Sequence, residues 1–158
     1  MSALEKFPRV TPFLWFDNNA EEAMKFYLSV FKGNSRKIDI KRKGKEVIAT
    51  TFQLQGQEFI ALNGGPHFKF TEAISLVVRC DSQEEVDDYW AKLSAEGSGD
   101  QCGWLKDKFG LSWQIVPSAL PQLLTDTDSA KSERAMIALM KMKKFDIETL
   151  QRAYAGQD

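Results

Sequence analysis

The spacing of apolar and polar residues predicts the same series of elements twice along the chain. Alternation predicts a strand over residues 10–16, and apolar residues three and four positions apart predict a helix over 20–31. Turn residues then separate three further strands, at 37–42, 46–54 and 58–62. The order recurs with a strand at 73–79, a helix at 83–96 and a hairpin across 102–117. Equivalent residues of the two series lie 63 or 64 positions apart, which indicates an internal duplication of a βαβββ module.

Short polar residues predict where the two module helices start. An Asx residue of the run Asp17-Asn18-Asn19 is expected to cap the first helix, and Asp81-Ser82 to cap the second. The pairs Glu21-Glu22 and Glu84-Glu85 follow in the first turns, where carboxylates interact favourably with the helix dipole. We expect these acidic pairs to be structural.

The tail after the repeat predicts two further helices. One spans about 130–142, and a last helix follows Phe145, with Asp146 as its N-cap. The first of them presents a Met/Leu surface made of Met136, Ile137, Leu139 and Met140. Since such a surface is unfavourable on a monomer, we expect it to cover the sheet or a second subunit, and we expect a homodimer.

Together these patterns predict a single α+β domain over residues 1–158. It comprises a first βαβββ module at 8–65, a second at 66–117 and a C-terminal helical extension at 118–158. A module alone has a four-stranded sheet with one helix on it. The other face of each sheet must therefore pack on something or curl around it.

The hairpin at residues 102–117 carries the main functional question. Asp107 and Gly110 suit its turn, because the carboxylate can bond the turn backbone and glycine accepts a positive φ. After the turn, Ser112, Gln114 and Val116 share one face of the strand. Gln114 is a polar residue within an apolar strand. It either forms a hydrogen bond inside a core or lines a pocket.

Charge and composition exclude several classes of protein. The net charge is −1, and no basic run exceeds Lys41-Arg42-Lys43, so we expect no nucleic-acid partner. No apolar run approaches the roughly 18 residues of a membrane span, and no signal-peptide pattern opens the chain. We expect a cytoplasmic protein without membrane association. Two cysteines and one histidine provide neither a disulfide framework nor a zinc site.

Several segments are typical of a known superfamily. The early segment Phe16–Tyr27 and the late segment Asp107–Gln114, set in two βαβββ modules, resemble the glyoxalase/bleomycin-resistance (vicinal oxygen chelate) superfamily. More closely, the chain resembles the PhnB-like branch, whose members often carry the name 3-demethylubiquinone-9 3-methyltransferase. That likeness rests on Ala61–Pro66, Phe68–Phe70, Val86–Trp90 and Cys102–Pro117. It covers about residues 8–154 and implies curved sheets around a cup, with a divalent metal in many members.

The residues at the ligand positions that this resemblance implies do not suit a metal. They are Thr11, Ser75, Gln114 and either Ile60 or Ala61. Only Gln114 is of a ligand type, and one neutral amide does not hold a metal, so we expect none. Asn63-Gly64-Gly65 precedes a proline rather than a helix, so it is not a loop that holds a nucleoside cofactor. We therefore expect no cofactor, and the methyltransferase name rests on resemblance alone.

Strand alternation predicts which side chains would face the cup. They are Thr11, Phe13, Trp15, Ser75, Val77, Arg79, Ser112 and Gln114. Such a pocket would suit a flat or apolar small molecule with a carboxylate, phosphate or carbonyl group. In the alternative interpretation Phe13 and Trp15 fill the cup as core, and Arg79 pairs with a surface carboxylate.

Two residues outside this pocket are further catalytic candidates. His67 is the single histidine of the chain, and Cys102 carries a thiol beside Gly103 and Trp104. Whether the protein is an enzyme stays open. We favour a metal-free small-molecule binding protein over a small-molecule enzyme of the superfamily and over a structural or regulatory dimer with a filled cup.

Overall fold

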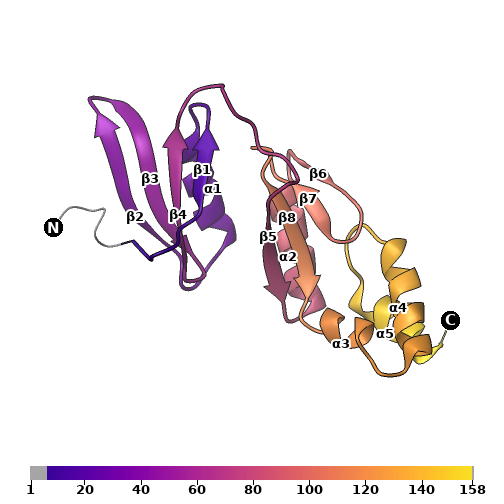
Figure 1. Ribbon diagram of the computed structural model, residues 1–158. Coiled ribbons are helices and arrows are strands. Elements are labelled where there is room, and N and C mark those ends of the chain that lie inside the picture. Colours follow the sequence, from indigo (N-terminus) through magenta and orange to yellow (C-terminus); the bar gives the residue numbers. More distant parts are fainter. Residues whose placement is uncertain (1–6, 158) are drawn as a thin grey trace. The chain divides into compact units, whose positions relative to one another are not determined.

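Each βαβββ series folds into a four-stranded sheet with one helix in the computed structural model, which describes residues 7–157 (Figure 1). The first series consists of β1 (Phe13–Phe16), α1 (Ala20–Val30), β2 (Arg36–Lys43), β3 (Glu46–Leu54) and β4 (Gln57–Asn63). The second consists of β5 (Ser75–Cys80), α2 (Gln83–Ser94), β6 (Ser98–Gly99), β7 (Trp104–Lys106) and β8 (Ser112–Pro117). The α+β class and the twofold βαβββ order are confirmed.

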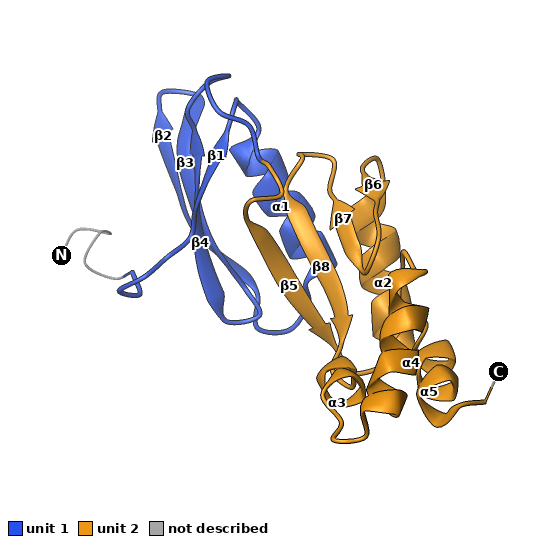
Figure 2. Ribbon diagram, turned by 45° about the vertical axis from the view of Figure 1, so that its right-hand side comes forward, with its two compact units in different colours: residues 1–70 blue, residues 71–158 orange. Residues whose placement is uncertain are grey.

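Both sheets have the same strand order. It is β1-β4-β3-β2 in the first sheet and β5-β8-β7-β6 in the second, and in each the first strand pairs with the last in parallel. The chain divides into two compact units, residues 1–70 and 71–158 (Figure 2). A single domain over 1–158 stays a prediction, and its ends, residues 1–6 and 158, lie outside the described part.

Helix α1 covers one face of the first sheet. Its buried side chains are Ala20, Ala23, Met24, Tyr27 and Val30. On the sheet, the buried residues include Leu14, Phe16, Phe52, Phe59 and Ala61. The ring centroids of Tyr27 and Phe52 are 6.2 Å apart, and those of Phe52 and Phe59 are 5.6 Å apart. These three rings form the aromatic part of the first unit's core.

The start of α1 corrects the expectation that an Asx residue at 17–19 caps it. Asn19 holds the N-cap position, but its side chain makes no capping hydrogen bond. The amide of Ala20 instead donates to Oδ1 of Asn63, at the end of β4, over 2.8 Å. The Nδ2 group of Asn63 donates to the carbonyl of Val47 over 3.0 Å. One side chain thus joins α1, β3 and β4, a link that local sequence patterns cannot reveal.

Helix α2 covers one face of the second sheet in the same way. Val86 and Leu93 are buried against β7 and β8, whose Leu105, Trp113 and Ile115 are also buried. The predicted cap holds here, because Oγ of Ser82 accepts the amide of Glu85 over 3.2 Å. Strand β6 is only two residues long, and the amide of Asp100, which follows it, donates to the carbonyl of Trp104 over 2.8 Å.

The extension forms three helices, α3 (Leu120–Leu124), α4 (Ser129–Met140) and α5 (Ile147–Ala155). Their common core consists of Leu120, Leu139, Phe145 and Leu150. The predicted N-cap of α5 is confirmed, because Oδ1 of Asp146 accepts the amide of Thr149 over 2.7 Å. No helix within residues 7–157 is long and apolar enough to cross a membrane.

The Met/Leu surface of α4 is only partly covered within the chain. Leu139 is buried, whereas Met136, Ile137 and Met140 are 43%, 51% and 62% exposed. The helix thus packs one side on the extension core and leaves three large apolar side chains at the surface. That a second subunit covers these side chains stays a prediction.

Replacing Asn63 by alanine should destabilise the protein by about 1–3 kcal/mol, because the Ala20 amide and the Val47 carbonyl both lose their partner. Urea denaturation measures this change. The matched control is Asn19→Ala, which removes a side chain without a capping bond and should stay within about 0.5 kcal/mol. A larger cost for Asn19→Ala than for Asn63→Ala would contradict the assignment.

Candidate functional site

The second sheet has a face that α2 does not cover, here called its helix-free face. Strand alternation and register place on it Ser75, Val77 and Arg79 of β5, Ser112, Gln114 and Val116 of β8, and Trp104 and Lys106 of β7. The intervening residues of these strands form the core beneath α2. The second-sheet residues predicted for the pocket therefore share one face.

Gln114 forms a hydrogen bond across this face. Its Nε2 group donates to the Ser75 hydroxyl oxygen over 2.9 Å, and the Gln114 side chain is half-buried. Two positions away, Ser112 is fully buried, and its hydroxyl has no hydrogen-bond partner in the described chain. Gln114 is therefore not a core amide. It stands on the helix-free face in a small polar group with Ser75 and Ser112.

Trp104 is a candidate site residue that the sequence prediction omitted. The register pairs Gln114 with Val77 on one side and with Trp104 on the other, so the three form a row across the sheet. Val77 is 61% exposed, and Trp104 is half-buried. The hairpin turn could have revealed Trp104, because folding the chain about residues 107–111 sets position 104 opposite position 114.

Charged residues flank this group. Lys106, opposite Ser112, forms an ion pair with Glu72, and that lysine's hydrogen bond lowers the pKa of the Glu72 carboxyl. Arg79 is largely exposed, and its Nε atom lies 3.6 Å from Oδ1 of Asp81. Arg79 therefore has the surface carboxylate partner of the alternative interpretation. It also lies on the helix-free face, opposite Val116.

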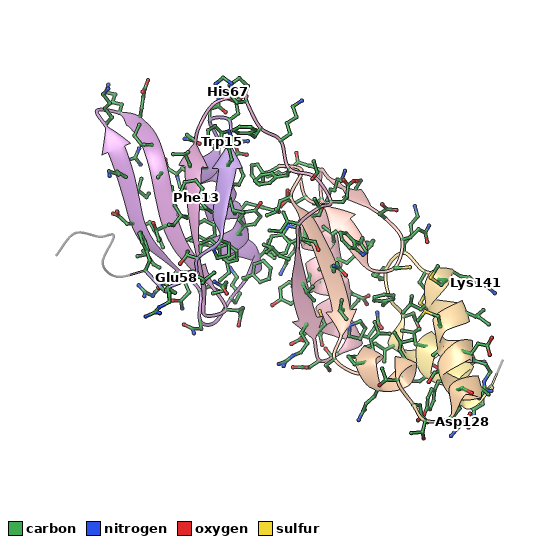
Figure 3. The ribbon with its side chains drawn as sticks, viewed as in Figure 1. Phe13, Trp15, Glu58, His67, Asp128 and Lys141 are labelled. Carbon is green, nitrogen blue, oxygen red and sulfur yellow. The ribbon has the colours of Figure 1, made fainter. Side chains whose placement is uncertain are left out.

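The first sheet also has a helix-free face, which carries Phe13, Trp15, Glu58, Ile60 and Leu62 (Figure 3). Phe13 is 57% exposed, so it is not part of the core beneath α1. Trp15 is half-buried, with the Phe68 ring edge-on to it at 4.9 Å between centroids. Glu58 was missed by the sequence prediction, although alternation from Ile60 would have placed it on this face.

The glycine pair after β4 serves to seat Trp15. A Cβ atom at Gly64 would lie 2.3 Å from the Trp15 ring, so only glycine fits there. The indole Nε1 group of Trp15 donates to the carbonyl of Gly65 over 2.9 Å. Asn63-Gly64-Gly65 is thus a packing turn, and these contacts give it no phosphate-binding role.

Thr11 corrects the predicted strand start. Strand β1 begins at Phe13 rather than at residue 10, and the Thr11 hydroxyl donates to the carbonyl of Pro8 over 3.1 Å. Pro12 lacks the N–H group that strand pairing needs, which explains the later start. The Thr11 hydroxyl therefore belongs to a local turn.

The ligand positions implied by the superfamily do not fit a divalent metal. Phe13 pairs with Ile60 in the first sheet, and the equivalent residue Val77 pairs with Gln114 in the second. Ile60, and not Ala61, is therefore the counterpart of Gln114. Ile60 carries no ligand atom, and the Ser75 hydroxyl accepts the Gln114 amide. Within residues 7–157 no three His, Cys, Asp or Glu side chains form a group that could hold a metal.

The two catalytic candidates lie outside both faces. His67 is exposed in the connection after β4 (Figure 3). Cys102 has a positive φ of 58°, and its thiol lies 3.9 Å from the carbonyl oxygen of Leu139. The backbone amide of Cys102 donates to the carbonyl of Met142 over 2.8 Å, so Cys102 joins the hairpin to the extension. The second thiol is inert, because burial, with Glu85 and Asp81, raises the pKa of Cys80 to about 12.

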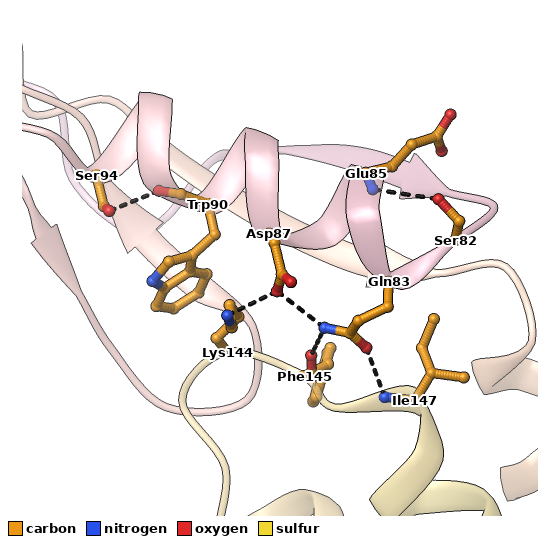
Figure 4. A network of polar contacts seen from close by, with 9 residues as sticks. All are labelled: Ser82, Gln83, Glu85, Asp87, Trp90, Ser94, Lys144, Phe145 and Ile147. Carbon is orange, nitrogen blue, oxygen red and sulfur yellow. Dashed lines mark hydrogen bonds and ion pairs between the residues drawn. The ribbon is translucent and has the colours of Figure 1, made fainter.

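A polar network holds the extension on α2 (Figure 4). The Gln83 side chain donates to the carbonyl of Phe145 over 3.0 Å and accepts the amide of Ile147 over 2.8 Å. Beside it, Lys144 lies 2.6 Å from Asp87, and this contact lowers the pKa of the Asp87 carboxyl. The start of α5 is thereby fixed to the second module.

The hairpin turn that positions Gln114 is organised by Asp107. This buried carboxylate accepts the amides of Phe109 and Leu111 through Oδ1, at 2.8 and 3.1 Å. Its Oδ2 atom accepts the indole N–H of Trp113 over 2.9 Å. Gly110 has φ 85°, as predicted for the turn. One side chain thus fixes the turn and the strand that follows it.

The family described as 3-demethylubiquinone-9 3-methyltransferase matches residues 8–116. The chain belongs to this PhnB-like family. A solved structure of a PhnB protein from Bacillus cereus, which carries the same description, is 38% identical and has a TM-score of 0.66. That match covers 70% of this chain and 100% of the Bacillus protein.

More distant structures show the same fold. The PA1353 protein of Pseudomonas aeruginosa is 18% identical, with a TM-score of 0.58 over 70% of this chain and 98% of that one. The fosfomycin resistance protein FosX of Listeria monocytogenes, solved with Mn(II) and sulfate, is 15% identical, with a TM-score of 0.52 over 70% of this chain and 89% of that one. No curated protein matches the chain. The fold of the PhnB-like family is thus that of the vicinal oxygen chelate superfamily.

An Asp107→Asn variant should lose about 1–3 kcal/mol of stability, because an amide nitrogen would then face the Trp113 indole donor. Urea denaturation gives the free energy of unfolding. A Trp113→Phe background serves as the control, since Asp107→Asn should cost less once the indole donor is gone. An equal cost in both backgrounds would show that this contact is not what Asp107 stabilises.

Proposed function

We propose that this PhnB-like protein binds a small organic molecule, without a metal, on the helix-free face of its second sheet. The observation that carries the proposal is the hydrogen bond from Gln114 to Ser75 beside Trp104. The two residues at the superfamily's metal-ligand positions on this sheet, Ser75 and Gln114, bond to each other instead of offering ligand atoms to a cation.

The chemistry of this face defines the class of ligand. Nε2 of Gln114 has a second hydrogen, and its carbonyl oxygen and the Ser75 hydroxyl proton have no partner among the described residues. These groups suit a carbonyl or carboxylate. Trp104 and the exposed Val77 offer apolar area beside them, which suits a flat ring. A planar aromatic acid or ketone satisfies both requirements.

We expect 2-naphthoate to bind this face and to change the fluorescence of Trp104. Gln114→Ala should weaken binding about tenfold, since one hydrogen bond to a charged group contributes about 1.5 kcal/mol. Fluorescence titration measures the dissociation constant, and Trp104→Phe should remove most of the signal. Gln122→Ala, at an exposed position on α3, is the matched control and should bind like the wild type.

Two outcomes would contradict this function. Equal affinity in Gln114→Ala and wild type would remove Gln114 from the site. One equivalent of Zn²⁺, Mn²⁺ or Ni²⁺ that binds tightly and survives dialysis, detected by native mass spectrometry, would show that a metal site exists after all. A superfamily enzyme would then become the better assignment.

We further propose a homodimer that covers Met136, Ile137 and Met140 of α4, because these exposed side chains form an apolar patch on one helix. Met140→Glu should shift the protein to monomer in sedimentation velocity, since a buried unpaired charge is unfavourable. Met140→Leu keeps the patch apolar and should remain a dimer. A wild type that stays monomeric at high micromolar concentration would exclude this interface.

We propose a cytoplasmic location. Cys80 and Cys102 are free thiols in the structure, and a reducing compartment keeps thiols in this state.

A further inference from the structure

The extension contains a groove between α4 and α5 that lies apart from both sheets. Its volume is about 420 Å³, which is within the range of small-molecule sites. Ala138, Met142 and Ala153 give it an apolar lining. All three belong to the second unit, so the groove does not depend on how the units are placed.

The walls of this groove are fixed at both ends of α5. At its start, Gln83 bonds the backbone at Phe145 and Ile147 (Figure 4). At its end, the Arg134 guanidinium of α4 donates to the carbonyls of Ala153 and Tyr154 over 3.0 and 2.8 Å. The two helices are therefore tied together, and the groove is formed before any ligand arrives.

The polar residues that line the groove give it a positive charge. Lys141 and Arg152 contribute two cations, Thr149 and Gln157 contribute neutral groups, and none of the described lining residues carries a carboxylate. Lys141 lies at the C-terminal end of α4 (Figure 3). Neither cation has an ion pair in the part of the chain that the structure describes, whereas neighbouring Lys144 is paired with Asp87. Two unpaired cations beside apolar surface are complementary to an anion that carries an apolar tail.

We propose that this groove is a second binding site, which takes a small organic carboxylate with a short aliphatic chain. The carboxylate binds Lys141 and Arg152, and the chain lies along Ala138, Met142 and Ala153. Thr149 and Gln157 supply further hydrogen bonds. This site is independent of the helix-free face of the second sheet and does not rest on the function proposed for that face.

Octanoate is the probe for this site, and amide chemical shifts of the ¹⁵N-labelled full chain report where it binds. The shifts should concentrate at Ala138, Met142 and Ala153. The double variant Lys141→Gln/Arg152→Gln should bind octanoate at least fivefold more weakly, and added salt should weaken binding to the wild type. Lys143→Gln removes a neighbouring lysine that does not line the groove and should leave the affinity unchanged.

Three outcomes would overturn the proposal. Octan-1-ol could bind as tightly as octanoate, which would show that the cations take no part. The shifts could instead map to Val77 and Gln114. The double variant could also lose thermal stability while it keeps its octanoate affinity. The two cations would then act on the helix ends, where lysine and arginine interact favourably with the dipole.

Discussion

A four-stranded sheet has two faces, and each βαβββ series of this protein supplies one helix to cover them. This constraint decides which residues become core. In the second sheet, Val78, Cys80 and Ile115 are buried beneath α2, while their neighbours in the chain turn to the other face. A glutamine in the middle of β8 is tolerated because its side chain bonds the Ser75 hydroxyl and the residue stays partly exposed. The candidate site is thus a direct consequence of having one helix per sheet.

Local patterns in the sequence predict those features whose physics is local. The turn at Asp107–Gly110 and the Ser82 and Asp146 caps follow from residues within five positions of one another, and the structure has them. The predicted cap of α1 was wrong because the side chain that accepts the Ala20 amide, Asn63, lies 43 positions away in the sequence. The bond from Gln114 to Ser75 spans 39 positions, and only the parallel register reveals it. The position of Trp104 opposite Gln114 could have been predicted, since the register of a hairpin follows from its turn.

The family's description and the geometry of this chain point in different directions. The description names a methyl transfer, yet the glycine pair at 64–65 packs against the Trp15 ring and accepts its indole N–H. The strand positions that hold a metal in the superfamily here hold Ile60 and a serine bonded to a glutamine. A family is defined by the residues that build its fold, and those can persist while the residues on the helix-free faces change.

Strand β8 contributes both to the candidate site, through Gln114, and to the contact with the extension, through Val116. Positions 112, 114 and 116 of β8 all lie on the helix-free face. Of these three residues, only Val116 packs against the extension core. The family match ends at this same residue, so the helices of the extension are built onto the last position of the shared fold. The extension covers this face only near its Pro117 end, and Gln114 stays partly exposed. The extension therefore stabilises the second module without filling its candidate site, and this leaves room for a separate groove between α4 and α5.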